Sequence, residues 1–197
     1  MNAASKWVSM ALPVQHHRFS LGEYEAMVEH GILTPDDRAE LLAGEIVEKM
    51  TIGSRHAACV KKVNRFFSTA LGSRVLVGVQ DPVRLPPDSE PEPDVTLLKA
   101  RDDLYARNHP NPDDVLLPVE ISDSSLELDR KIKLPLYAAA GIAEVWIVDL
   151  TSNAIEIYTE PYEGRYARAH TARGDDAIVP RAFPGLVVRA AELLPQA

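Results

Sequence analysis

Cysteine is almost absent from this chain, since Cys59 is the single cysteine among 197 residues. No intramolecular disulfide can form, and there is no cysteine cluster to hold zinc. Long apolar runs are also missing, because no stretch reaches the roughly 18 residues needed to span a bilayer. The N-terminal segment lacks the apolar stretch of a secretory signal peptide. We expect a soluble, cytoplasmic protein with no membrane partner, in which Cys59 is a small buried side chain.

Positive charge is scarce as well. Lys and Arg total 21 against 29 Asp and Glu, so the formal net charge is −8. Such an acidic chain does not coat nucleic acid as a polycation. A nucleic-acid enzyme is still compatible with this balance, because bound metal ions supply positive charge locally. The densest basic cluster consists of Arg55, Lys61, Lys62 and Arg65, which is not an extended basic patch.

The remaining composition is that of an ordinary globular protein. Apolar residues make up 46% and charged residues 25%, which excludes a disordered chain, a coiled coil and a collagen-like fibre. The length suits one domain. Five of the 15 prolines lie in the segment 82–93, which we interpret as a rigid loop and not as an interdomain linker. We predict one domain over residues 19–197, preceded by a flexible arm over residues 1–18.

Hydrophobic periodicity predicts an α+β (mixed α/β) fold with one central sheet flanked by helices. Thr34 begins one helix as an N-cap, and Ser124 with Glu127 has the spacing of a capping box that begins another. Helices are expected over residues 21–30, 34–43, 54–71 and 124–140. Strands are expected over residues 45–50, 74–80, 94–98, 115–121, 144–150 and 182–188, with a hairpin over 154–159 and 166–171.

Two carboxylates lie at the ends of strands that we expect to be neighbours. Asp94 begins the strand over 94–98, and Glu120 ends the strand over 115–121. If these strands pair antiparallel, the carboxylates meet at one sheet edge and repel unless a proton or a hard cation such as Mg²⁺ lies between them. The structural alternative is that Asp94 caps a turn and Glu120 is a surface charge. For Glu120 this alternative is weaker, because a carboxylate in an apolar run needs a partner.

The helix expected over 124–140 offers a cation to Glu120. At ~100° per residue, Lys133 falls on the same arc as Tyr137, on the apolar side of the helix. Lys131 instead lies four residues after Glu127, the spacing of a solvated surface pair. We therefore expect Lys133 to point inward, toward Glu120. The alternative is a Lys133 side chain that extends past the apolar edge into water.

Several long segments carry a family resemblance, namely EYEAMVEHGILTPDDRAELLAGEIVEKMTIGSRHAACV, EPEPDVTLL, LLPVEISDSSLELDRKIKLPLYAAAGIAEVWIVD and VPRAFPGLVVRAAELLP. They resemble the Uma2 family of restriction-endonuclease-like nucleases in the PD-(D/E)XK superfamily. The resemblance extends over nearly the whole chain from about residue 19. It implies a restriction-endonuclease-like central mixed sheet with an N-terminal helical extension and a β-rich C-terminal tail.

The motif of this superfamily matches the two carboxylates. Pro93-Asp94 corresponds to the PD element, and Glu120-Ile121-Ser122 corresponds to the (D/E)XK element. Ser122 stands where lysine is usual, and the resemblance implies that Lys133 on the following helix takes its place. It thereby implies an endonuclease that hydrolyses phosphodiester bonds, with DNA favoured over RNA as substrate.

The resemblance also implies a divalent cofactor. Asp94 and Glu120 would hold Mg²⁺ or Mn²⁺ with the Ile121 carbonyl as a third ligand, and Glu45 would add a further acidic group. Lys133 would orient the attacking water or stabilise negative charge.

Two weaker site candidates and two other functions stay open. His56, where the family often has His, could bind phosphate or complete the metal shell, although a structural role is the simpler interpretation. Gln80 precedes the Pro-rich loop and could face the site. The same fold could instead be a catalytically inactive nucleic-acid- or protein-binding module, or a hydrolase of small phosphodiesters. A homodimer would suit a nuclease that cuts two strands, and the sequence identifies no interface for one.

Overall fold

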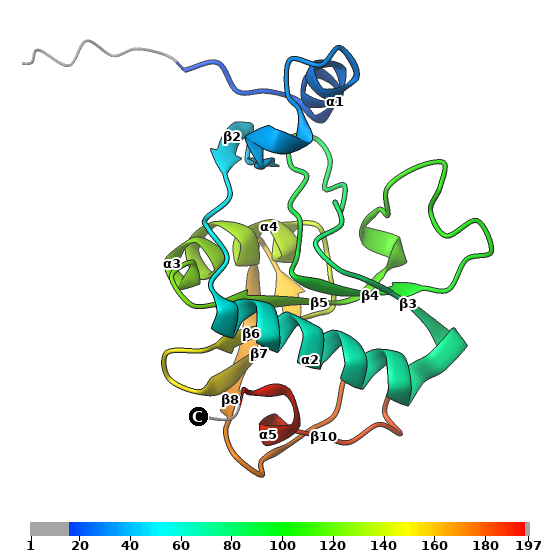
Figure 1. Ribbon diagram of the computed structural model, residues 1–197, viewed down its shortest axis with the longest axis vertical. Coiled ribbons are helices and arrows are strands. Elements are labelled where there is room, and N and C mark those ends of the chain that lie inside the picture. The colour runs from blue at the N-terminus through cyan, green and yellow to red at the C-terminus, as the bar shows by residue number, and fades with distance from the viewer. Residues whose placement is uncertain (1–15, 196–197) are drawn as a thin grey trace, which may run out of the picture.

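A six-stranded sheet forms the centre of the computed structural model, which describes residues 16–195 (Figure 1). Its strands, in the order in which they lie side by side, are β3 (Val75–Gly78), β4 (Val95–Lys99), β5 (Val115–Ser122), β6 (Glu144–Asp149), β7 (Ala154–Tyr162) and β8 (Arg165–Ala172). β5 and β6 run parallel, and the other neighbouring strands are antiparallel. The prediction of an α+β fold with one central mixed sheet is confirmed. Of the predicted arm over 1–18, residues 1–15 lie outside the described part of the chain.

Helices cover the two faces of this sheet. The helix α2 (Ser54–Leu71) has the predicted bounds and lies on one face (Figure 1). Its residues Val63 and Phe67 are buried in the same core cluster as Trp146. The helices α3 (Leu126–Leu128) and α4 (Leu134–Ala139) lie on the other face. Burial of the apolar stripe of each helix against the sheet is the main source of its stability. Within residues 16–195, no helix is both long and apolar enough to cross a membrane.

The helix predicted over 34–43 is wrong. A short 3₁₀ turn, Pro35–Asp37, ends at Arg38, whose backbone is left-handed with φ 47°. The chain then forms an antiparallel ribbon from β1 (Ala39–Leu42) and β2 (Glu45–Glu48). Ala43 and Gly44 both have positive φ at the turn, as expected for a two-residue hairpin. Pairing with β2 therefore overrides the local helix signal.

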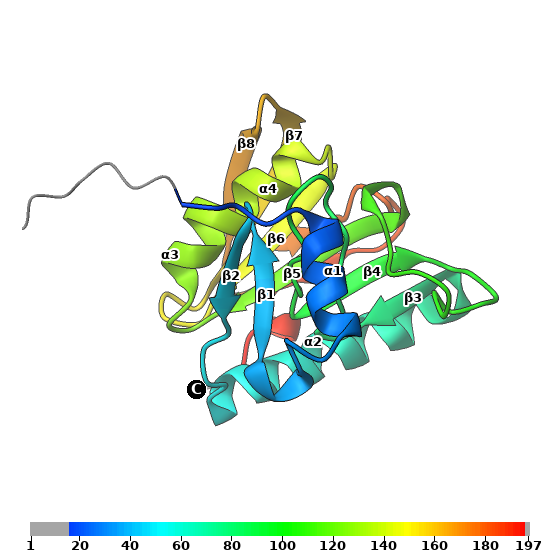
Figure 2. The ribbon, with the colours of Figure 1, turned by 90° about the horizontal axis from the view of Figure 1, so that it is seen from above.

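The N-terminal helix α1 (Leu21–Glu29) confirms the helix predicted over 21–30, and a capping box between Ser20 and Glu23 marks its start. It precedes the β1–β2 ribbon in the chain. Both the ribbon and α1 lie on the same side of the central sheet as α3 and α4 (Figures 1 and 2). This side of the sheet therefore carries the residues that can surround the end of β5.

The helix predicted over 124–140 is present but interrupted. Between α3 and α4, residues Asp129–Lys133 form a π-helical turn in which the N–H of Leu134 donates to the Asp129 carbonyl, five residues earlier. Pro135 follows directly and has no N–H to donate, which favours a change of hydrogen-bond pattern here. The predicted capping box of Ser124 and Glu127 is absent, because the Ser124 hydroxyl donates to Sδ of Met50 and the Glu127 carboxylate pairs with Lys131. The buried residues of the π turn are Asp129 and Lys133.

The C-terminal region differs partly from the prediction. The hairpin of β7 and β8 is confirmed, with Gly164 at positive φ in its turn. The strand predicted over 182–188 shrinks to β10 (Val188–Arg189), which pairs with β9 (Ala177–Ile178) before α5 (Ala190–Leu193). Turn hydrogen bonds from Phe183 to the Pro180 carbonyl and from Leu186 to the Phe183 carbonyl bend this segment. The remaining short 3₁₀ turns are Gly72–Arg74 and Pro112–Asp114.

Candidate active site

The paired strands β4 and β5 bring two distant carboxylates to one edge of the sheet. Val95 lies opposite Val119 in the antiparallel register, so that Asp94, just before β4, lies beside Glu120. The backbone N–H of Ile121 donates to Oδ2 of Asp94 at 2.9 Å. The predicted convergence of Asp94 and Glu120 is therefore observed. It follows from strand pairing, since the two residues are far apart along the chain.

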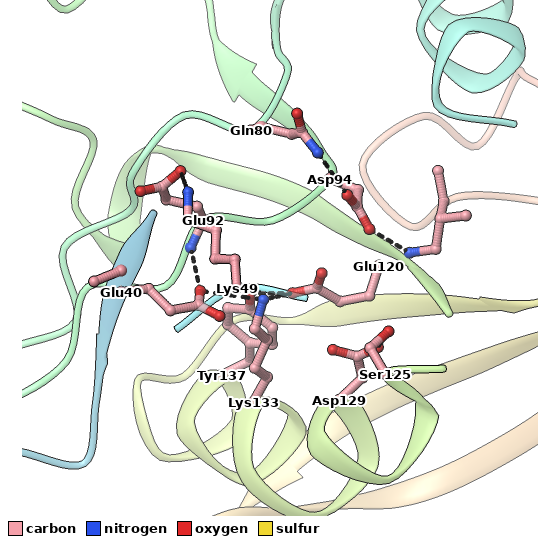
Figure 3. Close-up of polar contacts among 12 residues, drawn as sticks. Glu40, Lys49, Gln80, Glu92, Asp94, Glu120, Ser125, Asp129, Lys133 and Tyr137 are labelled. Atoms are coloured by element: carbon pink, nitrogen blue, oxygen red, sulfur yellow. Dashed lines mark hydrogen bonds and ion pairs between the residues drawn. The ribbon is translucent and has the colours of Figure 1, made fainter. Parts of the chain in front are cut away.

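Asp94 is held by three donors from separate elements. Besides Ile121, Nε2 of His56 in the first turn of α2 lies 3.0 Å from Oδ2. Nε2 of Gln80 donates to Oδ1 at 3.2 Å (Figure 3). Burial disfavours the charged form of His56, but the hydrogen bond and negative charge of Asp94 outweigh it and raise the His56 pKa. His56 and Gln80, the two weaker sequence candidates, thus both contact Asp94. Gln80 adopts φ 56° to do so.

Glu120 belongs to a second, fully buried group. Nζ of Lys133 lies 3.5 Å from Oε1 of Glu120 and 3.2 Å from Oε2 of Glu40 in β1. The Tyr137 hydroxyl donates to Oε1 of Glu120 at 2.6 Å. We call Glu40, Glu120, Lys133 and Tyr137 the Lys133 cluster (Figure 3). The inward orientation of Lys133 agrees with its helical spacing, because its side chain is 7% exposed while that of Lys131 is 72% exposed and pairs with Glu127.

Burial and charge shape the protonation of this cluster. Burial is the largest influence on Glu120 and raises its pKa to about 8, with Asp129 and Asp94 adding to the increase and Lys133 opposing it. Burial would lower the pKa of Lys133, but Glu120 and Glu40 more than compensate, and the net pKa is raised. Lys133 therefore stays protonated in the folded protein. It is a fixed positive charge beside the two carboxylates of the sheet edge.

Asp129 is a buried carboxylate that the sequence interpretation did not single out. Its Oδ2 accepts hydrogen bonds from the hydroxyls of Ser122 and Ser125, both at 2.7 Å. Burial raises the Asp129 pKa despite Lys133 and these two donors. Ser122, which occupies the usual lysine position of the motif, therefore holds Asp129 in place. The signal in the sequence was the spacing of four residues between Asp129 and the inward Lys133.

The expectation for Glu45 is not met. Its side chain is exposed and pairs with Arg18 at 2.9 Å, and it is not among the residues that line the cleft around Asp94. Glu40, five residues earlier in the chain, provides the carboxylate from this ribbon instead. The difference arises because this segment is a β-ribbon and not a helix. The Glu40 side chain is buried in β1, whereas the Glu45 side chain at the start of β2 is exposed.

These groups surround one open cleft. The cleft is lined from the β1–β2 ribbon, the segment 50–53, the start of α2, the sheet edge and the π turn. Its charged members are Arg38, Glu40, Lys49, Glu92, Asp94, Glu120, Asp123, Asp129 and Lys133, together with His56. Glu92 extends the network, because its backbone N–H donates to Oε2 of Glu40 at 2.9 Å and its carboxylate pairs with Lys49.

The donor set fits a hard cation with an incomplete protein shell. Among the described residues, no three His, Cys, Asp or Glu side chains are grouped closely enough to hold a metal ion alone. Asp94 and Glu120 provide two carboxylates, and within residues 16–195 Oε2 of Glu120 accepts no hydrogen bond from the protein. Mg²⁺ is typically bound by one or two carboxylates plus waters and phosphate oxygens. The residues present are therefore compatible with Mg²⁺ or Mn²⁺.

Comparison with known proteins gives one family and a similar solved structure. The sequence matches the Uma2 family, described as "Putative restriction endonuclease", over residues 21–192. The fold is similar to a crystal structure from Anabaena variabilis described as a "putative nuclease", with a TM-score of 0.69 and 13% identity over 89% of this chain and 97% of that chain. No protein of curated function matches the sequence. At this low identity, the structural likeness establishes the fold alone.

Proposed function

Because the chain belongs to the Uma2 family, we propose that it is a metal-dependent endonuclease that hydrolyses phosphodiester bonds in DNA. One observation supports this proposal above the others. Asp94, Glu120 and the protonated Lys133 share a single open cleft, although they come from the start of β4, the end of β5 and the π turn. Two carboxylates and one cation at a sheet edge suit the handling of a metal ion and a phosphate together.

Asp94 and Glu120 would hold the divalent ion, with the Ile121 carbonyl as a third ligand. The N–H of Ile121 points to Asp94, and the N–H and C=O of one residue in an extended strand point to the same side. The carbonyl therefore faces the side on which Asp94 lies. When bound, Mg²⁺ or Mn²⁺ would supply Lewis-acid stabilisation of negative charge at the phosphate.

Lys133 would act on the attacking water or on the developing negative charge. A buried ammonium beside two carboxylates is preorganised, so it need not be reoriented when charge develops at the phosphate. Glu40 would be a positioning residue, because it holds the Nζ of Lys133 at 3.2 Å from the side opposite Glu120. His56 and Gln80 would keep the Asp94 carboxylate in one orientation through their hydrogen bonds.

The test is hydrolysis of supercoiled plasmid DNA with Mg²⁺ or Mn²⁺. We expect the wild-type protein to nick or linearise the plasmid, and Asp94→Asn to lower the rate by at least about 100-fold. Glu156→Gln is the matched control, because Glu156 is a carboxylate paired with a cation outside the cleft. Its rate should stay within about twofold of the wild-type rate. Calorimetric titration with Mg²⁺ should show binding that Asp94→Asn removes.

Other outcomes would contradict the proposal. If folded wild-type protein binds neither Mg²⁺ nor Mn²⁺, with or without DNA, and cuts no nucleic acid, the cleft is that of a binding module. If it hydrolyses bis(p-nitrophenyl) phosphate and DNA neither competes nor is cut, the substrate is a small phosphodiester. Faster cleavage of RNA than of DNA under the same conditions would overturn the choice of DNA.

A further inference from the structure

Two cations at the mouth of the cleft are left without a role by the mechanism above. Arg38 ends the 3₁₀ turn before β1, and Lys49 follows β2 directly. The N–H of Lys49 donates to the Arg38 carbonyl at 2.8 Å, which continues the pairing of β1 with β2. Arg38 and Lys49 therefore lie at the same end of the ribbon. Both side chains line the cleft. We call Arg38 and Lys49 the cationic rim.

The rim matters because the cleft is otherwise acidic. Six carboxylates line it, against Arg38, Lys49 and Lys133 as the lining Lys and Arg residues. Lys133 is buried and engaged by both Glu40 and Glu120, so it is not accessible to phosphates outside the reacting centre. Among the described residues that line the cleft, Arg38 and Lys49 are therefore the Lys or Arg side chains that can meet a polyanion as it approaches. Contacts to backbone phosphates are made mainly by such side chains.

Lys49 is accessible but already paired. Its side chain is 28% exposed, and its ammonium contacts the carboxylate of Glu92, which is 17% exposed (Figure 3). Glu92 is held between Pro91 and Pro93, and its backbone N–H is bonded to Glu40. The carboxylate of Glu92 is therefore fixed beside Lys49 in a partly solvated position. A phosphate can replace this carboxylate as the partner of Lys49, since both are oxyanions that accept from an ammonium.

We propose that Arg38 and Lys49 bind a backbone phosphate next to the reacting one, and that Glu92 competes with this phosphate for Lys49. The inference rests on the proposed nuclease function and names its substrate class, a polynucleotide with at least two consecutive phosphates. A substrate with one phosphodiester would fill the carboxylate end of the cleft and leave the rim unused. The cationic rim thus favours nucleic acid over small phosphodiesters as substrate. Glu92 limits this preference, because its carboxylate competes with the phosphate for Lys49.

The test compares three variants in steady-state hydrolysis of a duplex oligonucleotide and of bis(p-nitrophenyl) phosphate, with Mg²⁺. Lys49→Ala should lower the ratio of kcat/KM for DNA to kcat/KM for the small diester by about tenfold, mainly through a higher KM for DNA. Glu92→Gln should change this ratio in the opposite direction, because the competing carboxylate is removed. Lys99→Ala is the control, since Lys99 is exposed and lies at the far end of β4 from Asp94. Urea unfolding checks that each variant is folded.

Binding of the same labelled duplex, followed by fluorescence anisotropy with and without Mg²⁺, separates this inference from the nuclease proposal. Lys49→Ala should weaken binding and lower the slope of log Kd against log salt by about one, and Lys99→Ala should change neither. If the wild type cuts DNA but the Lys49→Ala and Lys99→Ala variants behave alike, the proposed phosphate binding by the cationic rim is wrong and the nuclease proposal stands. If no DNA is cut but Lys49→Ala weakens DNA binding and Glu92→Gln strengthens it, the nuclease proposal fails. Phosphate binding by the cationic rim, in competition with Glu92, is then still supported. Absence of DNA binding by the wild type would overturn the proposed phosphate binding by the cationic rim.

Discussion

The π turn contributes cations to two clusters that contain the same kinds of residue. In the Lys133 cluster, Lys133 contacts two carboxylates, and a tyrosine hydroxyl donates to one of them at 2.6 Å. In the second group, which we call the Arg130 cluster, Arg130 pairs with Glu156, lies 3.9 Å from Asp149, and Tyr158 donates to Glu156 at 2.6 Å. None of these last four residues lines the cleft. Similar composition has therefore produced two different environments.

Burial and hydrogen bonding separate the two clusters. The Arg130 side chain is 35% exposed, and it forks onto both oxygens of Glu156. In Asp149, burial would raise the pKa, but the hydroxyl of Ser152 and nearby backbone N–H groups lower it overall. Glu120 accepts one hydrogen bond from a hydroxyl, its side chain is 3% exposed, and its pKa rises to about 8. Carboxylates that are fully satisfied stabilise a fold, whereas an under-satisfied one is available for a ligand.

The largest expected difference follows from removing the cation that faces the cleft. Lys133→Met should abolish measurable nuclease activity, a loss of at least about 1,000-fold, because the buried charge beside Glu120 disappears. It should also lower the free energy of unfolding by roughly 2–4 kcal/mol, since Glu40 and Glu120 lose their shared partner. Lys131→Met, two residues away and exposed, should change the unfolding free energy by less than about 0.5 kcal/mol. Plasmid cleavage and urea unfolding of both variants measure the two effects. Equal activities of the two variants would contradict the catalytic role proposed for Lys133.

The next comparison replaces one carboxylate in each cluster. Glu120→Gln should lower the cleavage rate by about 100-fold or more and weaken Mg²⁺ binding, because a neutral amide is a poor partner for a divalent ion. Glu156→Gln should leave the rate within about twofold but lower the free energy of unfolding by roughly 1–2 kcal/mol, because Arg130 loses a charged acceptor. Kinetics, calorimetry and urea unfolding distinguish these outcomes. A larger rate loss in Glu156→Gln than in Glu120→Gln would reverse the assignment.

The pH dependence of stability sharpens the comparison further. The pKa of Glu120 is raised from 4.5 to about 8, so between these values the unfolded chain has released a proton that the folded protein retains. The unfolded state then binds fewer protons, and the free energy of unfolding falls as the pH rises from about 5 to 8. We expect this fall to amount to roughly 2–4 kcal/mol in the wild type and to be smaller in Glu120→Gln.

Urea midpoints at pH 5 and pH 8 test this expectation without added metal. Glu90, whose pKa burial raises to about 7, contributes with the same sign and stays in both proteins. Part of the slope should therefore persist in Glu120→Gln. Stability that increases between pH 5 and pH 8 in the wild type, or an unchanged slope in Glu120→Gln, would contradict a protonated Glu120 in the folded state.

The smallest effects are expected from the two tyrosine hydroxyls. Tyr137→Phe and Tyr158→Phe each remove one hydrogen bond to a glutamate, and each should lower the free energy of unfolding by about 1 kcal/mol. Only Tyr137→Phe should change Mg²⁺ affinity and cleavage, by about three- to tenfold, because its hydroxyl orients Glu120. Calorimetry and plasmid cleavage on both variants provide the measurement. Similar changes of Mg²⁺ affinity and cleavage in both variants, or no change in Tyr137→Phe, would contradict the positioning role of the Tyr137 hydroxyl.

Much of the central scaffold was predictable from local patterns. The helix over 54–71 and the strand over 115–121 have long, regular hydrophobic patterns, and both are confirmed with nearly the predicted bounds. The apposition of Asp94 and Glu120 followed from assuming that consecutive strands pair antiparallel, which they do. The inward direction of Lys133 followed from helical spacing, which the π turn shifts but does not reverse.

Other features depended on contacts between distant segments. The segment 34–43 has good helix signals, yet it becomes a turn and a strand because β1 pairs with β2 and Leu41 bridges to Glu90. That pairing puts Glu40 against Lys133 and leaves Glu45 in solvent, the reverse of the expectation for this ribbon. The pairing of Lys49 with Glu92 likewise joins segments that lie far apart in the chain.

The difference between features that the sequence predicts and features that depend on the tertiary structure has a physical basis. Periodicity records which face of an element is apolar, and this information is contained in a few successive turns or residue pairs, so α2, β5 and the direction of Lys133 were accessible from the amino-acid order. The protonation of Glu120, the partner of Lys133 from β1 and the make-up of the cationic rim depend on which segments approach one another and how much water they exclude. Burial and electrostatic energies are properties of that three-dimensional neighbourhood, and they have no counterpart in a local pattern.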